Sequence, residues 1–214
     1  MTRLVFIIGS ALAFFVPSTL GFGPGSNIPD VALNWGFNPV TKVFMPEYTS
    51  KQNVVILGVP GAFLPTETEI QIPTYFEKQD LFRQAGIDNI IVYSVNDSAV
   101  VGIWNKQLVE AHGKQSNSGS NNKNGNIITF MADPTREFTQ ACGMELTDPR
   151  PATNGLVGRC KRFAMYVVNN VVQNVVVSEN YDDPTGDKDP TATCADAILY
   201  SLKTVQNQGY VKSN

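Results

Sequence analysis

The pattern of apolar and polar positions predicts a chain in which strands and helices alternate. Short apolar runs bounded by turn residues are typical of buried strands. Such runs occur at 54–59, 89–95, 127–131, 163–168 and 171–177. The longer mixed segments 66–84, 98–112 and 193–205 predict helices. Because strands and helices alternate from residue 53 onward, we expect a largely α/β layout.

Individual residues refine this pattern. Asp97 stands where a cap would begin the helix 98–112. Pro134 is expected to open a further helix, since proline is tolerated in a first turn. Pro73 interrupts the segment 66–84 and predicts a kink there. Asn169 and Asn170 separate two apolar runs and predict a tight hairpin.

Two segments are polar and predict exposed loops. Residues 114–126 contain no apolar side chain, so they cannot pack in a core, and we expect a mobile surface insertion. Residues 181–190 are rich in Asp and Pro. Their carboxylates could bind a hard cation, but the spacing does not match a calcium loop. A solvated acidic loop is therefore the favoured interpretation.

The first 21 residues differ from the rest. Arg3 is the only charge, an apolar run follows it, and Thr19 and Gly21 are small residues before Phe22. This pattern predicts a cleaved signal peptide. An uncleaved membrane anchor would need a longer run, of about 20 apolar residues. The junction at Phe22 also resembles the plastid-targeting leaders of algae with secondary plastids, so plastid delivery and secretion both remain open.

The remaining chain is long enough for one domain, predicted at 28–207, after a short leader remnant or transit segment at 22–27 and before a tail at 208–214. The net charge of −3 without a basic cluster argues against nucleic-acid binding. Three widely spaced cysteines do not form a disulfide framework or a zinc motif. His112 is the only histidine, which argues against a histidine-based metal site or triad. We expect no cofactor, and no membrane contact beyond the leader.

Several short motifs in a fixed order carry a family resemblance. In chain order they are Ile28-Pro29-Asp30-Val31, Pro60-Gly61-Ala62-Phe63, Ser94-Val95-Asn96-Asp97 with Trp104, Ala132-Asp133-Pro134-Thr135 with Phe138, Lys161-Arg162-Phe163, and Thr193-Cys194. Together they resemble the peroxiredoxins, above all the type-5 (atypical two-cysteine, type II) class. The resemblance implies a redoxin domain with a thioredoxin-like fold, in which helices flank a central mixed sheet and Ile28–Val31 is the opening strand. It also implies a homodimer that pairs around the Pro60–Phe63 loop.

The chain departs from the family at the positions that carry the chemistry. In the family, a cysteine thiolate in the first turn of a helix attacks the peroxide, and an arginine and the helix dipole lower its pKa. The resemblance places Glu67 at this cysteine, Leu64 at a peroxide-binding threonine, and Gln71 at a common histidine. Pro60 and Arg162 are retained. We therefore expect no peroxidase activity, because a carboxylate is not a soft nucleophile toward the O–O bond.

Glu67 suits a cationic site, because it is an anion where the family has a thiolate. We expect its carboxylate at a helix N-terminus, close to the Arg162 guanidinium, and we expect Glu67→Gln to lower thermal stability. Glutamate also has two oxygens, like the over-oxidised form of the family cysteine. A selected, locked state and decay of an unused site both remain open.

The cysteines give the remaining candidates for thiol chemistry. The resemblance places Cys194 at the family's resolving cysteine. Cys142 is expected to be a small buried hydrophobe. Cys160 lies between Arg159 and Lys161, so neighbouring cations are expected to lower its pKa and make it the best candidate for a reactive thiol.

Three functions follow from these observations. The first is a catalytically silent dimer that acts as a binding or structural subunit, by itself or within a larger protein assembly. The second is a thiol-dependent peroxidase that uses a remaining cysteine, Cys160 or Cys194, with thioredoxin or glutathione. The third is a carrier or sensor that binds a small cation or polar ligand in the anionic pocket. The changes at Leu64 and Glu67 favour the first function.

Overall fold

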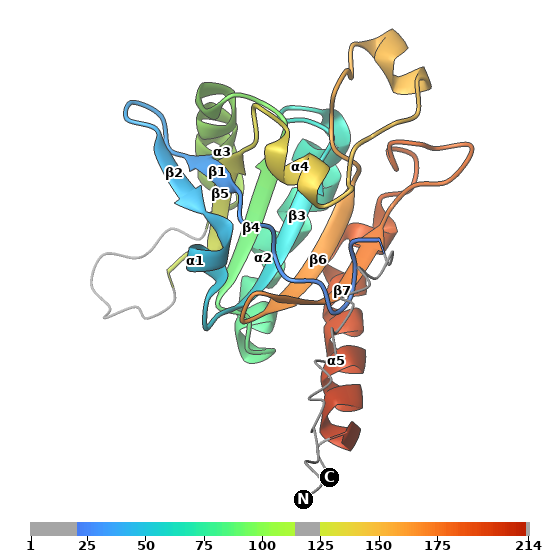
Figure 1. Ribbon diagram of the computed structural model, residues 1–214. Helices are drawn as coiled ribbons and strands as arrows, with labels where there is room; N and C mark the ends of the chain where they lie inside the picture. Colours follow the sequence, from blue (N-terminus) through green and yellow to red (C-terminus); the bar gives the residue numbers. More distant parts are fainter. Residues whose placement is uncertain (1–20, 114–124, 213–214) are drawn as a thin grey trace, which may run out of the picture.

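A mixed β-sheet forms the centre of the computed structural model, which describes residues 21–113 and 125–212 (Figure 1). The predicted signal peptide and most of the predicted 114–126 insertion lie outside these residues. In the described part of the chain, seven strands form one sheet in the order β2-β1-β5-β4-β3-β6-β7. Their bounds are β1 Ala32–Trp35, β2 Thr41–Phe44, β3 Asn53–Val59, β4 Asn89–Ser94, β5 Ile128–Ala132, β6 Phe163–Val168 and β7 Val171–Val177.

Parallel and antiparallel pairs meet at β3. The strands β3, β4 and β5 are parallel neighbours, whereas β6 pairs antiparallel with both β3 and β7. At the other edge, β1 pairs antiparallel with β5 and β2. The expected central mixed sheet is confirmed, and the five strands predicted from apolar runs agree with the structure to within one residue at each end.

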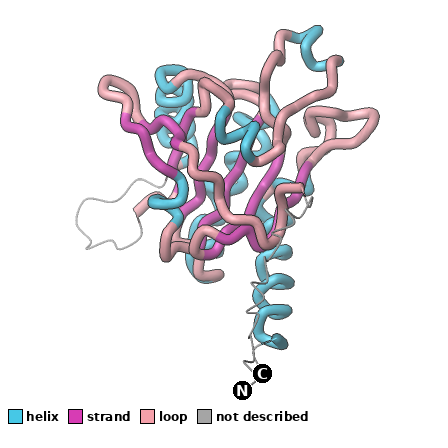
Figure 2. The backbone as a smooth tube through the Cα atoms, in the orientation of Figure 1, coloured by secondary structure: helices cyan, strands magenta, loops and turns pink. Residues whose placement is uncertain are grey.

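Helices cover both faces of the sheet (Figure 2). One face packs against α2 (Ile72–Gln84), α3 (Ser98–His112) and α5 (Ala195–Lys212), through residues such as Phe76, Trp104 and Leu202. The other face packs against α1 (Met45–Thr49) and α4 (Glu137–Ala141). The strand β3 supplies both cores because its side chains alternate: Leu57 faces the first and Ile56 the second. Figures 1 and 2 show the last turns of α5 extending beyond the sheet.

Two local predictions about turns and caps are confirmed. The Asp97 side chain caps α3 by accepting a hydrogen bond from the backbone N–H of Val100. Asn169 and Asn170 join β6 to β7 with φ values of 45° and 69°. Two successive positive φ angles are what a tight hairpin of this kind requires, and asparagine adopts them at low cost.

The N-terminal strand and its partner differ from the prediction. Residues 28–31 lie before the sheet and turn at Asp30, where the Val31 N–H donates to the Pro29 carbonyl, and the first strand begins at Ala32. Pro29 has no N–H to give to a ladder, which explains why pairing starts after it. The strand β2 was not predicted, because it is short and its side chains are mostly exposed.

Helix boundaries also differ at three places. The segment predicted as one kinked helix begins as the π-helix η1 (Thr66–Gln71) and continues as α2, with Pro73 in the first turn of α2. Pro134 lies in a turn, and α4 begins three residues later at Glu137. The closing helix α5 begins after the short 3-10 helix η3 (Thr191–Thr193) and continues into the predicted tail. A second 3-10 helix, η2 (Arg150–Asn154), lies between α4 and β6. No helix in the described ranges is both long and apolar enough to cross a membrane.

Candidate functional site

The site lies where β3 ends and the chain turns into η1. Pro60 follows β3 directly and is buried. The turn after it is tied to the end of β4, because the Ala62 N–H donates to the Asn96 side-chain oxygen at 3.0 Å. Phe63 adopts a left-handed φ of 64°, which is uncommon for a bulky residue. These constraints fix the direction in which η1 leaves the sheet.

The packing of α3 against η1 fixes the position of η1. Trp104 is fully buried, and its indole N–H donates to the Thr68 hydroxyl at 3.1 Å. Its ring lies 6.5 Å from the Phe63 ring and meets Phe130 edge to face at 5.2 Å. The helix η1 is therefore held from the outside while Glu67 points inward.

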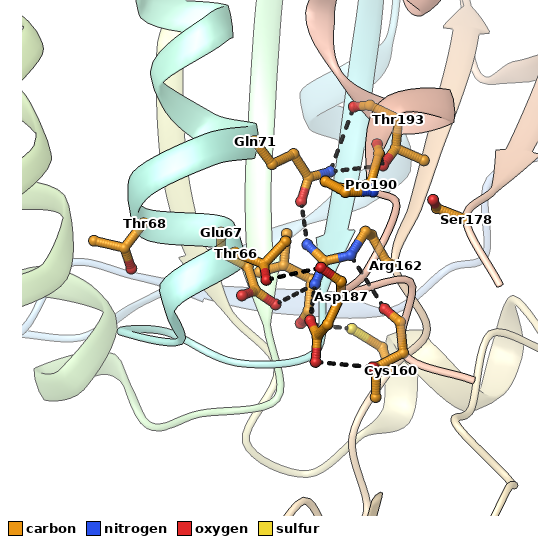
Figure 3. Close-up of polar contacts among 12 residues, drawn as sticks. Thr66, Glu67, Thr68, Gln71, Cys160, Arg162, Ser178, Asp187, Pro190 and Thr193 are labelled. Atoms are coloured by element: carbon orange, nitrogen blue, oxygen red, sulfur yellow. Dashed lines mark hydrogen bonds and ion pairs between the residues drawn. The ribbon is translucent and has the colours of Figure 1, made fainter. Parts of the chain in front are cut away.

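Arg162 is the centre of the site (Figure 3). It lies immediately before β6, and its side chain is fully buried. Its Nε donates to the Thr185 carbonyl at 3.1 Å and its Nη1 donates to the Gln71 side-chain oxygen at 2.6 Å. Its Nη2 donates both to Glu67 Oε1 at 3.1 Å and to Asp187 Oδ1 at 2.5 Å. Four of the five N–H donors of a guanidinium are thus used within the chain.

Glu67 is buried beside this guanidinium, so the expected contact with Arg162 is present. Its Oε1 accepts the bond from Arg162, whereas its Oε2 is buried without a hydrogen-bond partner. Burial raises the pKa of Glu67 from 4.5 to about 7, although the Arg162 charge opposes this rise. The negative charge of Asp187 also contributes to this raised pKa. The protonation of Glu67 therefore changes near neutral pH.

Asp187 was not predicted as a site residue, and the loop that carries it is not simply solvated. Asp183 is 5% exposed and accepts hydrogen bonds from the backbone N–H groups of Asp187, Lys188 and Asp189, at 3.0, 2.9 and 3.2 Å. The prediction of an exposed acidic loop at 181–190 is therefore wrong for its central part. The Asp183 carboxylate accepts the backbone bonds that fold the loop, and the Asp187 carboxylate accepts a bond from Arg162. Both roles follow from the need of buried N–H donors for acceptors.

Gln71 links Arg162 to the segment before α5. Its amide nitrogen donates to the Thr193 hydroxyl at 3.0 Å, while its oxygen accepts the bond from Arg162. The Tyr75 hydroxyl donates to the carbonyl of Thr193 at 2.6 Å. Residues of η1 and α2 therefore contact both Arg162 and the short helix η3, which precedes α5.

The structure corrects the prediction for Cys160. Its thiol is fully buried and donates to the Val59 carbonyl at 3.0 Å. Burial, together with the nearby carboxylates, raises its pKa to about 12. The flanking cations point elsewhere: Arg159 donates to the Val95 carbonyl and Lys161 pairs with Glu179. Cys160 therefore lacks the cationic surroundings that a reactive thiol needs.

The other two thiols differ in exposure. Cys142 is fully buried in the apolar core, as predicted, and burial raises its pKa. Cys194 is half-buried and lies between η3 and α5. Burial raises the pKa of Cys194, although Arg162 acts in the opposite direction. Among the three free cysteines, Cys194 is the most accessible.

Leu64 offers no polar group to the site. It is half-buried and lies against the Pro60–Phe63 loop, where a Cβ added to Gly61 would come within 3.2 Å of Leu64 Cδ1. Within the described residues, no group of three or more His, Cys, Asp or Glu side chains could hold a metal ion. The site is thus a buried cluster of one cation, two carboxylates and neutral hydrogen-bonding groups.

Comparisons with known proteins agree with this architecture. The redoxin family matches residues 24–199. The chain is 33% identical over 180 residues to the peroxisomal membrane associated protein 20 of Schizosaccharomyces pombe, covering 83% of this chain and 97% of that protein. It is 31% identical over 147 residues to peroxiredoxin-2C of Oryza sativa subsp. japonica, covering 68% and 80%.

Solved structures show the same fold. Reduced Prx3 from Vibrio vulnificus, in complex with H2O2, superposes with a TM-score of 0.65 at 29% identity and covers 84% of this chain and 95% of that one. Peroxiredoxin 5 from Alvinella pompejana superposes with a TM-score of 0.61 at 27% identity, covering 85% and 97%. The thioredoxin-like fold, the redoxin match over most of the chain and these relatives lead to one conclusion: the chain belongs to the peroxiredoxin family.

Proposed function

We propose that this chain is a peroxiredoxin-like protein without peroxidase activity, and that Glu67 occupies the position of the family's peroxide-attacking cysteine. The observation that carries the proposal is the contact of Glu67 with Arg162 at the end of the Pro60 loop. A carboxylate cannot form the sulfenic acid through which a thiol reduces a peroxide. The scaffold is therefore retained while the reacting atom is absent.

The binding groups of the site are also occupied. Arg162 donates to Thr185, Gln71, Glu67 and Asp187. These bonds use four of the five N–H donors and the side chain is fully buried, so a peroxide could not contact the guanidinium without a rearrangement of the site. Leu64 offers no hydroxyl to orient the substrate, and orientation supplies a large share of the rate in reactions of this kind.

The remaining cysteines give little support to peroxidase activity. Attack requires a thiolate, and burial raises the pKa values of both Cys142 and Cys160. Cys194 is more accessible, but its pKa is also raised. A peroxidase that uses Cys194 with thioredoxin or glutathione is the alternative function.

The contacts of Glu67 favour a locked site over a decayed one. Glu67 and Gln71 from η1 and Asp187 from the distant loop 181–190 all bond to one guanidinium. A buried arginine without such partners would be costly. We therefore infer that Glu67 is retained because it is a partner of the buried guanidinium in a site that holds no substrate.

A non-catalytic member of this family acts through its surfaces, and we propose a homodimer formed around the Pro60–Phe63 loop. Phe63, a large apolar side chain of this loop, is 42% exposed. Large apolar side chains that are exposed in a single chain are often covered in an interface. The dimer would serve as a binding or structural subunit.

We propose that residues 1–21 direct the protein into the secretory route, toward a plastid or out of the cell.

The decisive experiment is peroxide consumption by the purified protein, with thioredoxin or with glutathione as reductant. We expect no turnover above background for the natural chain, partial activity for Glu67→Cys, and more for Glu67→Cys with Leu64→Thr. Cys194→Ser is the matched control for the alternative function. Turnover by the natural chain that disappears in Cys194→Ser would overturn the proposal.

A further inference from the structure

Two carboxylates share one nitrogen of Arg162, but only one of them can reach water. Glu67 and Arg162 are fully buried, whereas the side chain of Asp187 is 41% exposed. Both acids bond to Nη2, at 3.1 Å from Glu67 and 2.5 Å from Asp187. With both acids ionised, the cluster holds two negative charges against one positive charge.

The surroundings of Glu67 contain few other charges. Arg162 approaches from the start of β6 and Asp187 from the loop 181–190. The Cys160 thiol, from the segment before β6, is neutral because its pKa is about 12. On its own helix, the next acid, Glu69, is exposed. From α3, the group that contacts η1 is the neutral indole of Trp104.

We propose that Glu67, Arg162 and Asp187 form a proton-controlled latch, which fastens the loop 181–190 while Glu67 is protonated and loosens it when Glu67 ionises. This inference rests on the proposed role of Glu67 as the acid of the site. It adds a regulated conformational change to a site that performs no peroxide chemistry.

The geometry decides which part moves. Glu67 lies on η1, which is continuous with the buried helix α2, so it cannot leave the site without disturbing the core. Its Oε2 has no donor, so an ionised Glu67 gains nothing at that oxygen. Asp187 is already half exposed, and water can replace its bond to Arg162. Repulsion between the two carboxylates is therefore relieved by displacement of the loop.

Linkage fixes the direction of the effect. Burial and Asp187 raise the pKa of Glu67 to about 7 in the closed arrangement. Moving Asp187 away and admitting water lowers this pKa toward its ordinary value of 4.5. The closed arrangement therefore binds the proton more tightly, so low pH closes the latch and a rise in pH through about 7 loosens it.

The loosening is local. The contacts to be lost are those of Asp187 and the Thr185 carbonyl with Arg162, and of the Asp187 carbonyl with the Thr66 hydroxyl. Without them the loop opens more often, so the three backbone N–H groups that donate to Asp183 exchange faster with solvent. Loosening would uncover a buried guanidinium, so a partner that recognises this open form would bind better above neutral pH.

Hydrogen exchange of the segment 181–190 tests the latch in the full chain, measured by mass spectrometry between pH 6 and pH 8. The natural chain is compared with Glu67→Gln, which stays neutral at every pH. Glu69→Gln is the matched control, because it removes an exposed acid from the same helix. Dividing the rates by those of Glu67→Gln removes the intrinsic pH dependence of exchange.

We expect exchange of this segment, relative to Glu67→Gln, to rise on the order of tenfold from pH 6 to pH 8 in the natural chain and in Glu69→Gln. An equal pH dependence in Glu67→Gln would overturn the latch. Should Glu67→Gln fail to fold, carbon-13 NMR of the Glu67 carboxyl in the natural chain decides instead. A Glu67 pKa near neutral that falls in Asp187→Asn supports the latch. A Glu67 pKa near 4.5 in the natural chain overturns it. Neither readout measures peroxide turnover, so failure of the latch and failure of the proposed function are separate results.

Discussion

The substitution Glu67→Gln should change how stability depends on pH, and the structure gives the direction. The pKa of Glu67 is raised from 4.5 to about 7 in the folded chain. Between these values the folded state binds more protons than the unfolded state, so the free energy of unfolding falls as pH rises. The stability that the protonated Glu67 contributes is fully present below pH 4.5 and is lost as the pH rises through about 7.

The magnitude follows from the same two values. The difference between 7 and 4.5 is 2.5, and each pH unit corresponds to about 1.4 kcal/mol. The full change in the free energy of unfolding is therefore about 3 kcal/mol, of which about 2 kcal/mol falls between pH 5 and pH 8. For a domain of this size that corresponds to roughly 5–10 °C in melting temperature. No reduction for solvent screening applies, because Glu67 is fully buried.

The assay is urea unfolding of the natural chain, Glu67→Gln and the control Glu69→Gln at several pH values from 5 to 8. The difference in unfolding free energy between the natural chain and Glu67→Gln should shrink with rising pH, and its sign can reverse above pH 7. Glu69→Gln should follow the natural chain. Parallel curves for the natural chain and Glu67→Gln would refute the reasoning, because they would mean that Glu67 does not titrate in this window.

Three further outcomes follow from the structure. Arg162→Leu should lower the free energy of unfolding by about 3–5 kcal/mol in urea titrations, because it leaves the buried Glu67 carboxyl without its cation; a loss below about 1 kcal/mol would mean that the site is hydrated. Alkylation of the native protein, followed by mass spectrometry, should modify Cys194 before Cys142 or Cys160, since the latter two are buried; rapid labelling of Cys160 would contradict its burial. Light scattering should give twice the mass of a single chain, and Phe63→Glu should shift the population toward monomer by placing a charge in the interface; an unchanged mass would place the interface elsewhere.

The elements that the sequence predicted well are those whose signal is local. Five strands follow apolar runs, because burial on both faces selects such runs directly. The cap at Asp97 and the turn at Asn169 depend on a few neighbouring residues. The strands β1 and β2 were missed because they are four residues long and partly exposed, so burial leaves little pattern in them.

The site was predicted only where a family motif marks it. Glu67 and Arg162 lie in such motifs, whereas Asp187 lies in a loop whose acidic residues look equivalent in the sequence. Only the fold separates the acid that reaches Arg162 from the others. The sequence predicted that Glu67→Gln lowers stability. Because Asp187 also pairs with the guanidinium and helps to raise the pKa of Glu67, the effect of this substitution on stability depends on pH.

The prediction for Cys160 failed for a related reason. Charges that neighbour a residue along the chain do not surround it in space, because successive side chains of an extended segment point in opposite directions. Arg159 and Lys161 reach Val95 and Glu179, while Cys160 points into the core. The charges of the sequence neighbours therefore do not predict the pKa of a thiol in such a segment.

The π-helix at Thr66–Gln71 has a consequence for how this site can change in evolution. In it, the Ile72 N–H bonds to the Glu67 carbonyl, five residues back, so the segment holds more residues per turn than an α-helix. Deleting one residue here could restore a regular α-helix without disturbing Pro73 and Tyr75, which are packed in the core. Each residue of an α-helix turns by about 100°, so the deletion would rotate Glu67 away from Arg162 by about that angle. A single insertion or deletion in this turn, and not only a substitution, would therefore create or abolish the buried pair of Glu67 and Arg162.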